Sequence, residues 1–291
     1  MQAPSASNSE SLDHLFESSI QDIGIPPCPT ILQKFMAEAN KESPDYRRLE
    51  QILGTDVGLA ASLIKTANSS FFGARQQARS VHTALMILGL KTSTIAVAGI
   101  VLRQAFPKLQ NMQRFWNGSA RISRLSGWLG LQLDIRGLRS DDAYTFGLFR
   151  DCGIAVLLGR FTDYQSVLGE ANRDLQRSFT QVEEATLPTN HTAVGASLAS
   201  NWGLPADIVA AIRSHHDSAA LNASEAGLSQ TSKRLIATSQ LAEHMVQRRL
   251  KLSMTEEWAK LGPACLQVLQ IDEAQMETLY MDSDSFMEAS T

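Results

Sequence analysis

The chain has 291 residues, of which 44% are hydrophobic and 19% charged, a globular composition that can fill a large core. Its 26 lysines and arginines nearly balance 30 aspartates and glutamates, and the two signs are interspersed, so we expect no nucleic-acid partner. Three widely spaced cysteines argue against a disulfide framework or a zinc finger and favour a reducing compartment.

The first third of the chain is predicted to be helical. Residues 1–11 are polar and serine-rich, so we expect a disordered start without a signal peptide. Pro26, Pro27 and Pro29 interrupt any helix, and apolar residues then return at helical spacing. The predicted helices cover residues 12–20, 31–39, 57–67, 80–90 and 92–106, with a shorter helix through residues 49–53.

The remaining two thirds show the same helical periodicity, and no stretch alternates as a strand does. The longest apolar run, residues 95–102, is far shorter than the roughly 20 residues that a membrane-spanning helix needs. We therefore expect an all-α, cytoplasmic protein with no membrane partner. The further predicted helices are 115–133, 143–158, 161–175, 179–187, 191–202, 207–216, 235–250, 258–269 and 274–286, with an exposed loop at 218–232.

A charge pair, Arg150 and Asp151, stands inside the otherwise apolar predicted helix 143–158. A buried charge pair costs free energy unless other groups partner it, so this position indicates a site or the remains of one. The downstream residues that could complete a cluster with Asp151 are His191, His215 and His216.

Neighbouring residues on a helix project about 100° apart, so only one of His215 and His216 is expected to share a site with His191 and Asp151. One carboxylate and two imidazoles could bind zinc or iron. Helix-capping and packing roles are the commoner use of such histidines.

Several short motifs follow one another in a fixed order. They are residues 25–32 (IPPCPTIL), 56–73 (DVGLAASLIKTANSSFFG), 80–90 (SVHTALMILGL), 147–153 (GLFRDCG), 191–195 (HTAVG) and 202–216, which begins WGLP and ends SHH. Together they resemble the HDOD domain, the HD-related output domain of bacterial signalling proteins, over about residues 15–217. The resemblance implies an HD-like helical fold and a regulatory or interaction module whose partners are signalling proteins of two-component or cyclic-dinucleotide pathways.

The resemblance also implies a domain organisation. The HDOD domain is expected over residues 12–217, with an N-terminal helical lobe at 12–106 and an HD-like lobe at 107–217. Residues 218–291 are then a C-terminal helical extension that packs on this domain.

The related HD hydrolases hold a divalent metal with a histidine, a histidine–aspartate doublet and a distant aspartate. At the corresponding positions this chain has Gly118, Arg150, Asp151 and Ser239. Arginine stays protonated and has no lone pair to give a metal. With Asp151 alone retained, we expect no catalytic residue and no metal or other cofactor, and we predict that Arg150 replaces the positive charge of the metal.

Two other functions stay open. The first is a metal-dependent phosphohydrolase or cyclic-dinucleotide phosphodiesterase, built on Asp151, His191 and either His215 or His216. The second is a sensor that binds a nucleotide without turning it over. Cys152 follows Asp151 directly, but core packing is a commoner role for it than nucleophilic attack.

Overall fold

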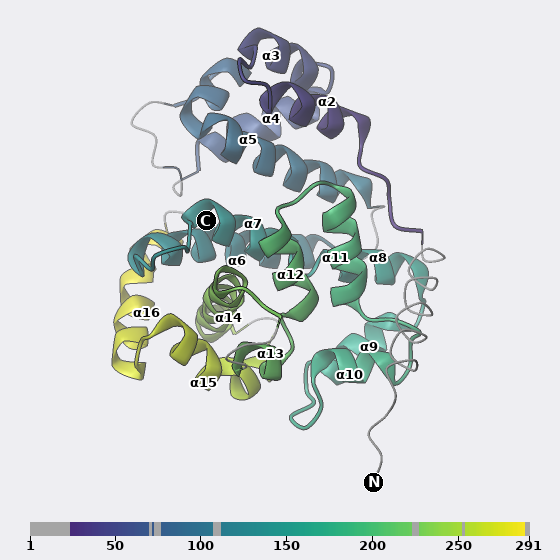
Figure 1. Ribbon diagram of the computed structural model, residues 1–291, viewed down its shortest axis with the longest axis vertical. Helices are drawn as coiled ribbons and strands as arrows, with labels where there is room; N and C mark the ends of the chain where they lie inside the picture. The colour runs from purple at the N-terminus through teal and green to yellow at the C-terminus, as the bar shows by residue number, and fades with distance from the viewer. Residues whose placement is uncertain are drawn as a thin grey trace. The chain divides into compact units, whose positions relative to one another are not determined.

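The computed structural model describes residues 24–69, 72, 77–106, 112–222, 227–251 and 254–288 (Figure 1). These residues form α-helices joined by loops, and no β-strand occurs among them, which confirms the predicted all-α class. The start predicted to be disordered (1–11) and the predicted helix 12–20 lie outside the described residues.

The chain divides into two compact units. We call residues 28–148 with 271–291 the N-terminal unit, and residues 1–27 with 149–270 the histidine unit. Residues 112–148 group with the N-terminal helices, and residues 218–270 and 271–291 fall in different units. The domain bounds expected from the resemblance stay a prediction.

The N-terminal unit is built on a long apolar helix, α5, against which α2, α3 and α4 pack. Asp45, Asp56 and Ser80 each accept hydrogen bonds from backbone N–H groups of the helix that follows, which fixes where α3, α4 and α5 begin. The helices of this unit are α2 (Thr30–Ala39), α3 (Tyr46–Gly54), α4 (Val57–Ala67), α5 (Val81–Ala105), α6 (Met112–Gln132), α7 (Ser140–Phe149, whose last residue belongs to the histidine unit) and α16 (Glu273–Glu288).

Helix α5 is long and apolar enough to cross a membrane by length and composition, and half of its most apolar stretch is buried within the protein. Gly89 interrupts it with a backbone φ of 69° and ψ of 168°, a conformation that glycine adopts without steric cost. The two predicted helices 80–90 and 92–106 therefore meet at a kink.

The histidine unit contains α8 (Cys152–Arg160), α9 (Tyr164–Ala171), α10 (Phe179–Glu184), α11 (His191–Asn201), α12 (Ala206–Ser214), α13 (Ser218–Asn222), α14 (Gln230–Leu250) and α15 (Glu257–Leu269). Helix α11 packs on both α8 and α12, and α14 packs on α12 and α15. The indole N–H of the buried Trp202 donates to the carbonyl of Pro26 (3.1 Å), which fastens the proline segment to the end of α11.

Two predictions of helix extent are wrong. The single helix predicted at 143–158 is two helices, α7 and α8, because Asp151 has a non-helical backbone (φ −101°, ψ 12°). The loop predicted at 218–232 contains α13 and the start of α14. Asp217 and Ser229 accept backbone N–H groups of the residues that follow and so start these helices.

Helices α8 and α11 approach each other so closely that a side chain does not fit at Gly153. A Cβ atom there would lie 2.0 Å from the carbonyl oxygen of His191 and 2.8 Å from the amide nitrogen of Gly195. Both atoms belong to the backbone of α11, so they cannot turn aside as a flexible side chain can.

We predict that Gly153→Ala lowers the free energy of unfolding by about 1–3 kcal/mol, the usual cost of overpacking a core. Gly159→Ala in the same helix is the matched control, since a Cβ atom there meets nothing within 4 Å. Denaturant titration followed by circular dichroism measures both variants. Equal stability of the two would contradict the close approach of α8 and α11.

Candidate metal centre

Asp151 and three histidines converge where helices of the histidine unit begin or end. Asp151 lies between α7 and α8, and His191 is the first residue of α11. His215 directly follows α12, and His216 is the next residue. One possible ligand atom from each of the four lies within 4.8 Å of the others.

The prediction that only one of His215 and His216 faces this cluster is wrong. It assumed that both residues continue a regular helix. Helix α12 ends at Ser214, so the angular spacing of helical side chains does not apply to His216. The end of a helix therefore brings two successive imidazoles to one site.

The shortest contacts join Asp151, His191 and His215. The Oδ1 atom of Asp151 lies 3.3 Å from Nε2 of His215 and 3.8 Å from Nε2 of His191. The two Nε2 atoms are 3.3 Å apart. The histidines are buried, and the Asp151 side chain is 18% exposed. Three imidazole nitrogens and a carboxylate are a ligand set typical of zinc and other divalent transition metals.

The opposite ring nitrogen of each histidine is held by an oxygen. Nδ1 of His191 lies 2.8 and 2.9 Å from the two carboxylate oxygens of the buried Glu183, which also accepts the hydroxyl of Tyr164. Nδ1 of His216 contacts the carboxylate of Glu257, and Nδ1 of His215 lies 2.8 Å from the carbonyl of Ile212. Such outer partners orient metal-binding imidazoles and fix their tautomer.

These contacts set the protonation of the two inner histidines. Burial lowers the pKa of His215 to about 3, and the neighbouring His216 contributes to this lowering, so the His215 ring is neutral at physiological pH. Burial also opposes the charge on His191, but the negative charge of Glu183, its hydrogen bond to Nδ1 and the charge of Asp151 together raise the pKa of His191.

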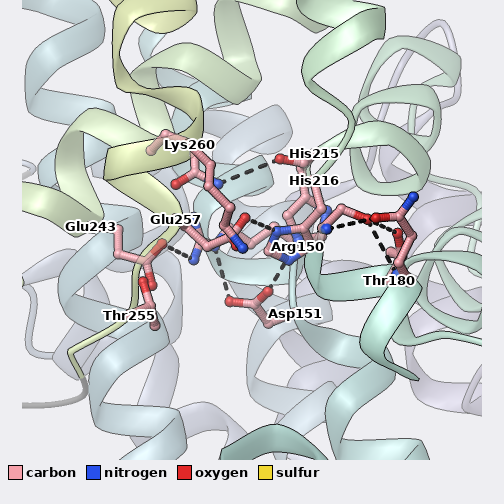
Figure 2. Close-up of polar contacts among 12 residues, drawn as sticks. Arg150, Asp151, Thr180, His215, His216, Glu243, Thr255, Glu257 and Lys260 are labelled. Carbon is pink, nitrogen blue, oxygen red and sulfur yellow. Dashed lines mark hydrogen bonds and ion pairs between the residues drawn. The ribbon is translucent and has the colours of Figure 1, made fainter. Parts of the chain in front are cut away.

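On the other side of Asp151 lies the buried guanidinium of Arg150 (Figure 2). Nε of Arg150 donates to Oδ2 of Asp151 (2.9 Å), Nη2 donates to Glu243 on α14 (2.6 Å), and Nη1 donates to the hydroxyl of Ser239 (3.4 Å). Three of the four positions predicted to correspond to HD-hydrolase ligands, 150, 151 and 239, are thus joined by direct contacts. Gly118 lies in α6, which belongs to the N-terminal unit.

The charges of Arg150 and Asp151 stabilise each other. Burial by itself would raise the pKa of Asp151, yet the positive charge of Arg150, together with His215 and His191, holds that pKa well below its usual range. Burial also opposes the charge on Arg150, but the negative charges of Asp151 and Glu243 raise its pKa. The pair is therefore ionised throughout the physiological range.

Glu183, Glu243 and Glu257, which supply the outer contacts, were not predicted from the sequence. For two of them a signal was present. Glu183 follows Phe179 at a spacing of four residues and Glu257 precedes Leu261 at the same spacing, so both carboxylates lie on the apolar stripe of their helix. A charged residue on such a stripe is buried and needs a partner.

The Cys152 side chain packs against α11 and points to no reactive group. Its thiol is buried and donates to the carbonyl of Gly195 (3.6 Å). Burial raises the pKa of this thiol, and the nearby charge of Asp151 raises it further. A thiol held in its protonated form is a poor nucleophile, which agrees with a packing role.

The fold and this centre define the class of HD-like helical proteins. Within that class the chain belongs to the HDOD domain family, whose model matches residues 25–218, and the resemblance seen in the sequence is confirmed. A solved structure of a protein from Shewanella amazonensis SB2B, titled "Putative phosphohydrolase", is 16% identical and has a TM-score of 0.69, covering 93% of this chain and 94% of that one.

Two further relatives show how the match extends. A "Putative signal transduction protein" from Marinobacter aquaeolei VT8 is 20% identical, with a TM-score of 0.66 over 97% of this chain and 66% of that one. An uncharacterised protein from Treponema pallidum (strain Nichols) is 23% identical over 197 residues, which is 66% of this chain and 38% of that protein. The chain therefore matches well under half of that relative's length.

We predict that Arg150→Ala destabilises the protein strongly, because it removes a buried guanidinium and leaves the partly buried carboxylates of Asp151 and Glu243 without their cation. Breaking a buried ion pair from one side typically costs about 3–5 kcal/mol. Arg160→Ala, at the exposed end of α8, is the matched control and should change stability by no more than about 0.5 kcal/mol. Melting curves identical to that of the unchanged protein would refute a structural role for Arg150.

We also predict that the three free thiols differ in reactivity. Cys28 is half-buried, whereas Cys152 and Cys265 are buried, and burial raises the pKa of Cys265 to about 12. The native protein should react rapidly with Ellman's reagent at one thiol, and the unfolded protein at all three. Cys28→Ser should remove the rapid phase; a rapid phase that survives this change would place a second thiol at the surface.

Proposed function

We propose that this chain is a non-catalytic signalling module of the HDOD family that holds one divalent transition-metal ion between Asp151, His191, His215 and His216. The observation that carries this proposal is the convergence of one carboxylate and three imidazoles, whose ligand atoms lie within 4.8 Å of one another. The one N–H group of a neutral His215 is directed from Nδ1 to the Ile212 carbonyl (2.8 Å), so the lone pair on Nε2 faces Oδ1 of Asp151 and Nε2 of His191. A lone pair and a carboxylate oxygen that face each other are donors that a cation binds.

The charge of the cluster is consistent with a bound cation. Counted as ionised, the carboxylates joined by these contacts outnumber the arginine and lysine that contact them by two. An uncompensated charge in a buried cluster is costly, and this excess is balanced either by one divalent cation or by protons on the histidines, of which His191 has a raised pKa. The carboxylates are Asp151, Glu183, Glu243 and Glu257, and the cations are Arg150 and Lys260.

Arg150 supports one metal ion rather than two. The two oxygens of Asp151 face different groups: Oδ2 accepts from Arg150, while Oδ1 faces His215 and His191. The guanidinium thus takes the side of the carboxylate on which a second ion would bind, and it cannot act as a ligand. This proposal replaces our expectation of a metal-free site and keeps the predicted role of Arg150 as a substitute charge.

The ligand count argues against catalysis. Four protein ligands complete the coordination typical of a structural zinc site, whereas a catalytic site keeps a position open for water. A buried, closed site suits a module that acts through other proteins. Because the chain belongs to the HDOD family, we propose that its partners are signalling proteins of two-component or cyclic-dinucleotide pathways.

The test is metal content. Protein purified without chelators should contain close to one zinc, iron or manganese ion per chain by elemental analysis, and the apoprotein should take up one equivalent of Zn²⁺ or Mn²⁺ in a titration. Asp151→Ala and His191→Ala should lose this ion, while His82→Ala, which removes a half-exposed histidine of the N-terminal unit, should keep it.

Three results would overturn the proposal. If folded protein neither contains nor takes up metal, protons on the histidines, and not a metal ion, balance the negative charge of the cluster. Metal-loaded protein that hydrolyses bis(p-nitrophenyl) phosphate or a cyclic dinucleotide, with the activity lost in Asp151→Ala, would establish an enzyme. A nucleotide bound without turnover would indicate the sensor instead.

A further inference from the structure

Glu257 connects the histidine cluster to a part of the chain that the family model does not match. That match ends at residue 218, and Glu257 is the first residue of α15. Its side chain is buried, with the residue 2% exposed, and contacts Nδ1 of His216 and the ammonium group of Lys260 (Figure 2). A carboxylate in the first turn also interacts favourably with the helix dipole.

The beginning of α15 has few other polar anchors among the described residues. The amide of Glu256 donates to the carbonyl of Asn172 (3.0 Å), and Nζ of Lys260 donates to the carbonyl of Arg177 (3.1 Å). Helix α15 packs mainly on α14. Of these contacts, the one between Glu257 and His216 leads directly to a candidate metal ligand.

Building on the proposed function, we propose that Glu257 is the positioning residue for His216 and that, through it, metal binding and the docking of α15 stabilise each other. A carboxylate on Nδ1 keeps the proton on that nitrogen, so that Nε2 is the atom left to bind a metal, and it makes the ring more basic. A bound cation in turn strengthens the hydrogen bond from Nδ1 to Glu257.

Energetic coupling of this kind is reciprocal. If docking of α15 favours the ligand orientation of His216, a bound ion must favour docking of α15 by the same factor. The C-terminal helices then report whether the site is occupied. This gives the signalling module a readout on a segment outside the residues that the family model matches.

The experiment compares Zn²⁺ affinity, measured by competition with a chromophoric chelator, with hydrogen exchange of the apo and Zn²⁺-loaded protein. In the unchanged chain, Zn²⁺ should slow exchange in α11 and in α15. Glu257→Gln should weaken Zn²⁺ binding about 10- to 100-fold, the range found for outer partners of metal ligands. At saturating Zn²⁺ this variant should retain the slowing in α11 and lose it in α15.

The matched control is Glu256→Gln. Its side chain is exposed and makes no capping hydrogen bond, so its affinity and exchange should equal those of the unchanged chain. Glu257→Asp keeps the charge on a shorter side chain and should fall between the unchanged chain and Glu257→Gln. The exchange measurement on the unchanged chain needs no variant and holds even if a substitution prevents folding.

The outcomes separate the inference from the proposed function. Slowing of α11 but not α15 by Zn²⁺ would overturn the coupling and leave the metal site intact. Equal Zn²⁺ affinity of Glu257→Gln and the unchanged chain would overturn the positioning role alone. An unchanged chain that binds no metal would overturn both.

Discussion

The carboxylate of Asp151 is the constraint on which the histidine unit depends. Its two oxygens contact different groups. Oδ2 lies 2.9 Å from Nε of Arg150, and Oδ1 lies 3.3 Å from Nε2 of His215. A carboxylate in this position is stable only if both sides supply positive charge or a donor. The break between α7 and α8 places it there, and the glycine contact between α8 and α11 keeps His191 close.

Arg150 gives the site a charge whose chemistry differs from that of a metal ion. The guanidinium brings a permanent positive charge, held by Asp151 and Glu243 and touching Ser239. It activates no water, whereas a bound metal ion can do so.

The helices beyond the family match are part of the centre as well as a covering layer. Helix α14 supplies Ser239 and Glu243 to Arg150, and α15 supplies Glu257 to His216. The centre therefore rests on two segments, one shared with the family and one outside its matched region. Differences between members of the family in this second segment would change the outer contacts first, and with them the affinity of the site.

Apolar periodicity predicted the helical class and most helices, because side-chain spacing reports which face of a helix is buried. The order of the motifs predicted the family. The charge pair in an apolar stretch and the histidines that follow it singled out Arg150, Asp151, His191, His215 and His216. Periodicity did not predict the break between α7 and α8 at Asp151 or the end of α12 at Ser214. Only the tertiary structure therefore showed that His215 and His216 both reach the cluster. Glu243 and Glu257 lie 93 and 41 residues from the groups they contact. Local patterns carry no information on such pairings, since only packing of α14 and α15 decides which carboxylate meets which cation.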